Sequence, residues 1–246
     1  MEIMKKLMDL VFPPGMECPL CGAETARDNL CRKCRVKMTD RRGFRSCNLC
    51  GRFFAEQASA AAGSLCEECR SELPAFFPAR SLGPYTGELK EAIYLFKYRG
   101  RRSLADGFGQ LMAGLFLDHP IFACADVLVP VPLNREKILL RGFNQSAMLA
   151  ENMGRILNLP VNACLDRIIN TTSQSRLTGR VRRENVKGAF VPKTAPGRVN
   201  VILVDDILTT GATAGECARV LLEAGANSVG VLTLAAGVRE KSVLSS

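Results

Sequence analysis

Several residue types on which binding and catalytic chemistry often depends are scarce in this 246-residue sequence. There is no tryptophan, there are three tyrosines, and the only histidine, His119, stands before a proline in an expected turn. Around His119 we find neither a nucleophile-histidine-acid triad nor a histidine metal site. The shortage of aromatic rings argues against a stacking platform for the bases of single-stranded nucleic acid.

Two nucleotide-binding motifs are also absent. The phosphate loop of P-loop enzymes, G-x-x-x-x-G-K-[S/T], occurs nowhere in the sequence. Gly107, Gly109 and Gly114 do not have the spacing of the dinucleotide-binding motif G-x-G-x-x-G, and they lie within an expected helix. These absences exclude P-loop NTPases and enzymes with a dinucleotide-binding fold.

No apolar run approaches the roughly 20 residues that a membrane-spanning helix requires. Residues 4–12 are largely apolar, but Asp9 interrupts them and two prolines end them, so the segment is too short for an export signal. We expect a short amphipathic helix there that docks on the rest of a cytoplasmic protein. A membrane-surface role for this helix is the alternative.

Basic residues exceed acidic residues, and the excess is uneven along the chain. The formal net charge is +9, and residues 1–74 hold 12 Lys and Arg against 10 Asp and Glu, so +7 of the excess lies in residues 75–246. A basic balance favours polyanions, which here means pyrophosphate, nucleic acid or both. Residues 97–102, K-Y-R-G-R-R, form a basic corner that faces either such a ligand or solvent.

Eight of the eleven cysteines form four C-x-x-C pairs between residues 18 and 69. Two thiolates at this spacing can hold one tetrahedral zinc ion together with a second pair, and a following glycine, as at Gly22 and Gly51, relieves the turn. Disulfide bonds are the alternative, but a reducing compartment disfavours them. We therefore expect two structural Zn²⁺ sites built from Cys18, Cys21, Cys31, Cys34, Cys47, Cys50, Cys66 and Cys69.

The assignment of the four pairs to the two ions stays open between sequential and interleaved pairing. The similarity of C-N-L-C-G at residues 47–51 to C-P-L-C-G at residues 18–22 favours two similar ribbons in series. Large apolar residues are few in this segment, so metal binding of roughly 10–16 kcal/mol per site would supply most of its folding free energy. Its basic residues face either nucleic acid or solvent, and they are Arg32, Lys33, Arg35, Lys37, Arg41, Arg42 and Arg45.

After residues 73–78, where two prolines flank two phenylalanines, the pattern changes to alternating strands and helices. Short apolar runs without polar alternation indicate a parallel sheet covered on both faces by helices. We therefore predict an N-terminal helix and double zinc ribbon over residues 1–74 and an α/β domain over residues 75–246. Expected strands cover residues 80–85, 126–131, 200–205 and 227–235, expected helices cover residues 87–98, 103–118, 145–157 and 215–223, and a polar tail is expected over residues 237–246.

The stretch V-I-L-V-D-D-I-L-T-T-G-A-T at residues 201–213 carries the chemistry. Its four apolar residues predict a buried strand, so Asp205 and Asp206 fall at a strand end, where ligands of open α/β sheets bind. The next turn leads into a helix whose first N–H groups, with close approach allowed by Gly211, can hold a phosphate. A phosphate does not pair with two carboxylates, so these need another partner, such as vicinal ribose hydroxyls with or without a hard cation.

This stretch resembles the 5-phosphoribosyl-1-pyrophosphate (PRPP) motif of type I phosphoribosyltransferases. The resemblance implies that Asp205 and Asp206 contact the ribose as catalytic residues, and that PRPP binds together with Mg²⁺. The alternatives are an ordinary buried strand before a capped helix and the Walker B strand of an NTPase, whose P-loop is missing here. The resemblance also implies that the 5′-phosphate lies on the turn formed by Thr209, Thr210, Gly211, Ala212 and Thr213.

The likeness extends over nearly the whole chain and narrows to the ComF family of competence proteins. The residues that carry it are V-P-V-P-L at 129–133, R-G-F-N-Q at 141–145 and the PRPP motif, all after the paired C-x-x-C knuckles. It implies a pyrophosphate site with Pro132, Arg135 and Arg141, beside which Asn144 and Gln145 either reach the ligand or cap a helix. It also implies a flexible loop within residues 171–188 that closes over PRPP and contains Gln174, Arg176, Arg180, Arg182 and Arg183.

Two functions of different classes follow from these patterns. The first is an enzyme that transfers a phosphoribosyl group to an unidentified acceptor with release of pyrophosphate. Positioning and charge stabilisation dominate such a reaction, which explains the lack of a catalytic Ser, Cys or His. The second is a competence protein that binds single-stranded DNA through its zinc ribbons and basic loops and meets other proteins of the competence machinery. If both hold, PRPP is either the substrate or a regulator.

Overall fold

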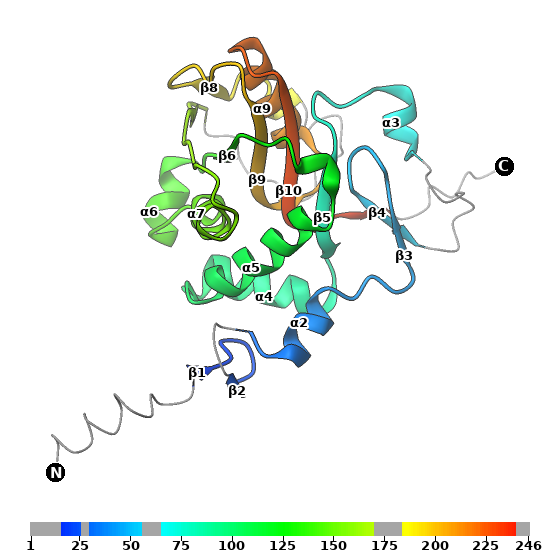
Figure 1. The fold of residues 1–246 in the computed structure, drawn as a ribbon, viewed down its shortest axis with the longest axis vertical. Helices are drawn as coiled ribbons and strands as arrows, with labels where there is room; N and C mark the ends of the chain where they lie inside the picture. Colours follow the sequence, from blue (N-terminus) through cyan, green and yellow to red (C-terminus); the bar gives the residue numbers. More distant parts are fainter. Residues whose placement is uncertain (1–15, 26–29, 56–64, 170–183, 240–246) are drawn as a thin grey trace, which may run out of the picture.

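A computed structural model describes residues 16–25, 30–55, 65–169 and 184–239 of the chain (Figure 1). The helix expected over residues 4–12 lies outside these ranges, as do the predicted flexible-loop residues from Gln174 to Arg183. Within the described ranges, no helix combines the length and the apolar character that crossing a membrane requires.

A four-stranded parallel sheet forms the centre of the α/β part, as the sequence predicts. Strands β10 and β9 stand in the middle of it, and most of their residues are buried. All neighbouring strands in this sheet run parallel. The spatial order is β5 (Ala79–Pro84), β10 (Ser228–Ala236), β9 (Asn200–Leu208) and β6 (Val127–Pro130).

Two hydrophobic clusters cover the two faces of this sheet, because successive residues of a strand point to opposite sides. On β9, Val201 and Leu203 belong to one cluster, and Ile202 and Val204 belong to the other. The sheet is therefore the middle layer of three, with helices on both faces (Figure 1). The first cluster includes α9 (Ala212–Glu223), and the second includes α4 (Gly87–Tyr98), α5 (Leu104–Leu117) and α7 (Gln145–Leu157).

Most predicted helices and strands are confirmed, and their ends shift by a few residues. Helices α4 and α7 have the predicted ends, whereas α9 begins three residues earlier than expected. The loop expected up to residue 188 ends sooner, because residues 184–186 are helical. Some short elements were not predicted, namely α6 (Arg135–Arg141), η1 (Pro120–Phe122) and the antiparallel strands β7 (Leu165–Arg167) and β8 (Phe190–Pro192).

Two small ribbon units precede the sheet in the chain. In each of them a short helix begins directly after a cysteine, Cys31 in the first unit and Cys66 in the second. The similar C-x-L-C-G knuckles therefore mark two similar units in series, as predicted. The first unit contains β1 (Met16–Glu17), β2 (Glu24–Thr25) and α2 (Arg32–Met38), and the second contains β3 (Phe44–Ser46), β4 (Phe53–Ala55) and α3 (Glu67–Ser71).

The chain after β10 does not form a polar tail from residue 237 onward, so that prediction was wrong for its first residues. Residues 238 and 239 form β11 (Val238–Arg239), which pairs in parallel with Phe53 and Phe54 of β4 in the second ribbon. Val238 also packs against the cluster that contains α9. A strand of two residues takes its pairing from tertiary contacts, so it leaves no pattern in the sequence.

The two ribbons dock on the α/β part in different ways. In the first, side chains of α2 reach the helices, since Arg35 donates to Gln110 Oε1 at 2.6 Å and Lys37 pairs with Glu88 at 2.7 Å. In the second, the backbone itself is in contact, because Ala79 N–H at the start of β5 donates to the Leu49 carbonyl at 2.8 Å. The second ribbon is thus held by main-chain bonds that do not depend on exposed side chains.

Helices α5 and α7 approach closely at Gly109. A Cβ on Gly109 would lie 2.4 Å from the Cβ of Asn152 on α7, which is closer than two carbon atoms can stand. Gly114, further along the same helix, has no atom within 4 Å of an added Cβ. Gly109 therefore makes room for α7, whereas Gly114 makes room for no neighbouring helix.

We expect Gly109→Ala to lower the free energy of unfolding by about 1–3 kcal/mol, because the added methyl group overpacks the contact with Asn152. Gly114→Ala is the matched control in the same helix and should raise this free energy by about 0.5–1 kcal/mol, since alanine favours helix. Chemical denaturation followed by circular dichroism measures both values. A Gly109→Ala protein as stable as the wild type would contradict the close approach of the two helices.

Candidate functional site

The two predicted catalytic carboxylates lie near the end of β9. Asp206 is buried and forms an ion pair with Lys97 of α4, whose Nζ lies 2.8 Å from Oδ2. Oδ1 of Asp205 accepts hydrogen bonds from Ser146 Oγ and from the backbone N–H of Asp206, both at 2.9 Å. Burial, together with the charge of Asp206, raises the pKa of Asp205 to about 7. A cation or hydrogen-bond donor placed beside the pair would favour its fully charged form.

A cavity of about 560 Å³ contains both carboxylates. Four basic side chains line the same cavity, so positive charge exceeds negative charge in a partly enclosed space. Burial lowers the pKa of Lys137 and of Arg167, and nearby cations lower the former further. Such surroundings favour an anionic ligand. The four basic residues are Lys97, Lys137, Arg141 and Arg167.

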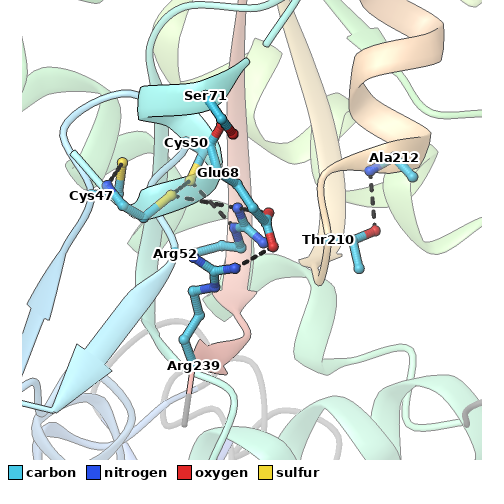
Figure 2. A network of polar contacts seen from close by, with 9 residues as sticks. Cys47, Cys50, Arg52, Glu68, Ser71, Thr210, Ala212 and Arg239 are labelled. Carbon is cyan, nitrogen blue, oxygen red and sulfur yellow. Dashed lines mark hydrogen bonds and ion pairs between the residues drawn. The ribbon is translucent and has the colours of Figure 1, made fainter. Parts of the chain in front are cut away.

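The turn between β9 and α9 carries the predicted phosphate-binding residues. Gly211 has a φ of +79°, in the left-handed region that favours glycine, and it directly precedes the first helical residue, Ala212. Thr210 Oγ1 accepts a hydrogen bond from Ala212 N–H at 3.3 Å (Figure 2). The first turn of α9 contains no acidic residue, so its N–H groups and the helix dipole are suited to an anion. Thr213 lines the cavity, whereas Thr209 is exposed.

The structure brings some of the predicted pyrophosphate residues to the cavity and not others. Pro132 and Arg141 line it, and so does Lys97 from the basic corner. Arg135 does not, because it is exposed at the start of the unpredicted helix α6, and Lys137 from the same helix lines the cavity in its place. Sequence reasoning missed Lys137 although it lies only two residues beyond Arg135.

Arg167 is a second lining residue that sequence reasoning missed. It belongs to the short strand β7, and its guanidinium lies 5.4 Å above the ring of Phe190 on β8. Burial lowers the pKa of Arg167, and the negative charge of Asp205 opposes this effect in part. The one signal in the sequence was its position just before the predicted flexible loop.

Asn144 caps α7, which was the alternative to ligand contact for this residue. Its Oδ1 accepts the N–H of Ser146 at 3.0 Å, and its Nδ2 donates to the Val131 carbonyl at 3.1 Å. These bonds connect the end of β6 to the start of α7 and place Ser146 beside Asp205. Gln145 becomes the first residue of the helix and lines the cavity.

The eight cysteines form two clusters, and their pairing is sequential. Within each cluster the four sulfur atoms lie within 4.8 Å of one another. Tetrahedral zinc with Zn–S bonds of about 2.3 Å places its sulfur ligands about 3.8 Å apart. The distances of 3.6 Å between Cys21 and Cys31 and 3.7 Å between Cys50 and Cys66 fit this geometry. Sites closed by four thiolates are structural, and here they are Cys18, Cys21, Cys31 and Cys34, and Cys47, Cys50, Cys66 and Cys69.

The second cluster is buried, and a cation lies beside it (Figure 2). All four of its cysteines are buried, whereas Cys21 of the first cluster is exposed. Arg52 donates to Cys50 Sγ at 3.3 Å and to Cys66 Sγ at 3.6 Å, and it pairs with Glu68. Glu68 pairs in turn with Arg239 of β11. A buried guanidinium offsets the negative charge that four thiolates leave around a divalent ion.

A second cavity, of about 470 Å³, lies between this network and the turn that joins β9 to α9. Arg52 and Glu68 line it from the ribbon, and Thr210 and Gly211 line it from the turn. Figure 2 shows Arg52, Glu68 and Thr210. Phe76, from the segment that joins the ribbon to β5, is buried with Cζ 3.5 Å from the position of a Cβ on Gly211. The turn therefore has the carboxylate cavity on one side and the second ribbon on the other.

Known proteins resemble this chain in both of its parts. A profile of the double zinc ribbon domain matches residues 7–70. Competence protein F of Haemophilus influenzae is 28% identical over 221 residues, which cover 85% of this chain and 91% of that protein. Among solved structures, the glutamine PRPP amidotransferase of Bacillus subtilis has a TM-score of 0.38 and 18% identity over 54% of this chain and 26% of that chain.

A further relative settles the family. Competence protein ComFC of Bacillus subtilis is 33% identical over 238 residues, and the match covers 88% of this chain and 93% of that protein. It includes both the ribbon part and the sheet part, because neither alone is long enough for such coverage. The chain therefore belongs to the ComF family of competence proteins.

Proposed function

We propose that this ComF-family chain binds PRPP with Mg²⁺ and transfers or senses its phosphoribosyl group, in connection with DNA uptake during natural transformation. The observation that carries the proposal is one cavity that is lined by two carboxylates, four cations and Thr213 in the first turn of α9. The names of the relatives supply the connection to competence. We also propose a cytoplasmic location, since reduced thiols in two metal sites suit a reducing compartment.

Each part of PRPP has a chemically suited partner in this proposal. The 5′-phosphate lies on the turn of residues 209–213 and at the start of α9. The ribose hydroxyls donate to Asp205 and Asp206. The pyrophosphate accepts from Arg141 and Lys137. When bound, Mg²⁺ neutralises charge on the pyrophosphate, and the carboxylates are its protein ligands.

The proposed reaction is displacement of pyrophosphate from C1 of the ribose by a nucleophilic base or amine. The bond from C1 to the pyrophosphate oxygen breaks, the bond to the acceptor forms, and the pyrophosphate leaves with the electron pair. Arg141, Lys137 and Arg167 offset the charge that develops on the leaving group.

Direct binding of single-stranded DNA is the second candidate, and the contacts of the ribbons weaken its support. Arg35 and Lys37 bond to α5 and α4, and Arg41 donates to two carbonyl groups of β5. Arg32 and Lys33 are exposed. Three basic side chains that were expected to face either solvent or DNA thus bond to α4, α5 and β5 instead. This favours PRPP binding as the primary function.

Asp205→Asn should weaken PRPP binding roughly 10–100-fold, because a charge-assisted hydrogen bond contributes about 1.5–3 kcal/mol. Isothermal titration calorimetry with PRPP and Mg²⁺ measures the affinity, and pyrophosphate release with candidate acceptors measures transfer. Asp118→Asn, exposed at the end of α5, is the matched control and should bind like the wild type. Salt-dependent DNA binding that survives Asp205→Asn, in a protein that ignores millimolar PRPP, would support the second candidate instead.

PRPP affinity should fall about tenfold as the pH is lowered from 8 to 6. The pKa of Asp205 is raised to about 7, so below that pH this carboxyl holds a proton in the unliganded protein. A ligand that brings Mg²⁺ and hydroxyl donors binds the charged form, and the proton must leave first. Asp205→Asn lacks the titrating group, so an equal pH dependence in that variant would show that the ligand's own phosphates cause it.

Cys47→Ser and Cys21→Ser should each reduce the zinc content from two ions per chain to one, because each removes a ligand from a different cluster. Cys47→Ser should lower the melting temperature more, since its cluster is buried in the core that contains α9. Zinc analysis and thermal denaturation measure the two effects. Cys124→Ser, at an exposed cysteine outside both clusters, is the control. Loss of both ions in Cys21→Ser would argue against two independent sites.

A further inference from the structure

Gln145, the first residue of α7, has a buried polar atom that no other described residue satisfies. The residue is 1% exposed, and no hydrogen-bond partner for its Nε2 exists in the described part of the chain. Gln145 is also one of the residues that line the cavity containing Asp205 and Asp206. Buried N–H groups almost always have an acceptor, because a lost bond to solvent must be replaced. The cavity is the place from which an acceptor can come.

Arg141 fixes which atom of this amide is left without a partner. Nη1 of Arg141 donates to Gln145 Oε1 at 3.0 Å, and a guanidinium accepts no hydrogen bond, so the amide oxygen must face it. Nη2 of Arg141 donates to the Tyr98 hydroxyl at 3.1 Å, and the guanidinium lies 4.8 Å above the Tyr98 ring. With its oxygen held in this way, the nitrogen of Gln145, a pure donor, is the amide atom that still needs a partner.

We propose that Gln145 Nε2 donates a hydrogen bond to a pyrophosphate oxygen of the ligand and thereby determines specificity for pyrophosphate esters. The inference rests on the proposed function, because it assigns a further residue to the same site. Lys137, Arg141 and Arg167 line the cavity with Gln145. An anionic oxygen satisfies the amide donor and these cations together, whereas a hydroxyl group would bring no charge to offset theirs.

The place of Gln145 in the fold separates it from the phosphate-binding turn. Gln145 follows β6 and α6, while the turn follows β9. Asp205 connects the two, because it accepts from Ser146, the neighbour of Gln145, and lies four residues before Thr209. A ligand whose only phosphate lies on the turn leaves the Gln145 amide without a partner. A ligand with a second anionic group at its other end can accept a hydrogen bond from Gln145 Nε2. Gln145 therefore distinguishes PRPP from ribose 5-phosphate.

The test compares wild type, Gln145→Leu and Gln145→Glu in calorimetric titrations with three ligands. These are PRPP with Mg²⁺, inorganic pyrophosphate with Mg²⁺, and ribose 5-phosphate. Leucine keeps the bulk of the side chain without the donor, and glutamate keeps its shape but offers acceptors only. We expect Gln145→Leu to weaken PRPP and pyrophosphate binding about tenfold or more, Gln145→Glu to weaken it further, and ribose 5-phosphate binding to stay within about twofold of wild type.

Gln110→Leu is the matched control for the loss of a glutamine. Gln110 lies on α5, accepts a hydrogen bond from Arg35 and does not line the cavity, so all three affinities should stay at their wild-type values. The melting temperature of the unliganded variants provides a second measurement. Gln145→Leu should melt close to the wild type, because removal of a buried donor without a partner offsets the loss of the hydrogen bond from Arg141 Nη1. Loss of a merely structural glutamine would lower the melting temperature.

The outcomes separate this inference from the proposed function. Equal PRPP and pyrophosphate affinities for wild type and Gln145→Leu overturn the inference, even where PRPP binds. A lower melting temperature with a uniform loss of all three ligands also overturns it. If the wild type binds pyrophosphate but not PRPP, and Gln145→Leu loses that binding, the proposed function fails and the inference stands. A wild type that binds neither ligand overturns both.

Discussion

Two hydrogen bonds at Gly237 connect the parallel sheet, at the start of the turn between β9 and α9, to the second zinc ribbon. The N–H of Gly237 donates to the carbonyl of Leu208 at the end of β9 at 2.9 Å, and its own carbonyl accepts the N–H of Phe53 on β4 at 3.1 Å. A Cβ on Gly237 would lie 3.5 Å from the carbonyl oxygen of Thr209, so this backbone passes directly beside the turn. From there β11 continues along β4. The ribbon is therefore bonded to the residues from which the turn begins.

The second ribbon is consequently part of the core of the α/β fold. Its four cysteines belong to the hydrophobic cluster that also contains Leu203 of β9 and Leu221 of α9. The contact with β5 is equally close, since a Cβ on Gly51 would lie 2.6 Å from the Ala79 carbonyl oxygen. Zinc binding of roughly 10–16 kcal/mol per site thus stabilises the layer beneath the turn as well as the ribbon. The first ribbon, held largely by side chains of α2 and by Arg101, has no such connection to the turn among the described contacts.

The sequence was sufficient for those elements whose burial leaves a periodic pattern. The apolar run at residues 201–204 predicted β9, and the repeated knuckles predicted ribbons in series, because burial on two faces and tetrahedral ligation both constrain residue spacing. The short elements carry no such constraint. No residue of α6 is buried, so nothing in its sequence predicted that Arg135 would point away and Lys137 toward the cavity. Arg167 depends likewise on the three-residue pairing of β7 with β8.

The charges of the cavity limit the kind of ligand that can complete it. Two adjacent carboxylates are costly to bury, and burial beside the charge of Asp206 raises the pKa of Asp205. Lys97 Nζ lies 2.8 Å from Asp206 and offsets its charge. Asp205 has no such ion pair among the described residues, so it gains most from a cation that enters with the ligand. The other basic side chains and the amide of Gln145 gain most from anionic oxygens. A free metal ion would pair with Asp205 only, and a free anion would pair with the basic side chains and Gln145 only. The proposed ligand, a metal-bound pyrophosphate ester with a sugar diol, brings both a cation and anionic oxygens. The unfavourable burial of two carboxylates is therefore a reason to expect ligand binding at this site.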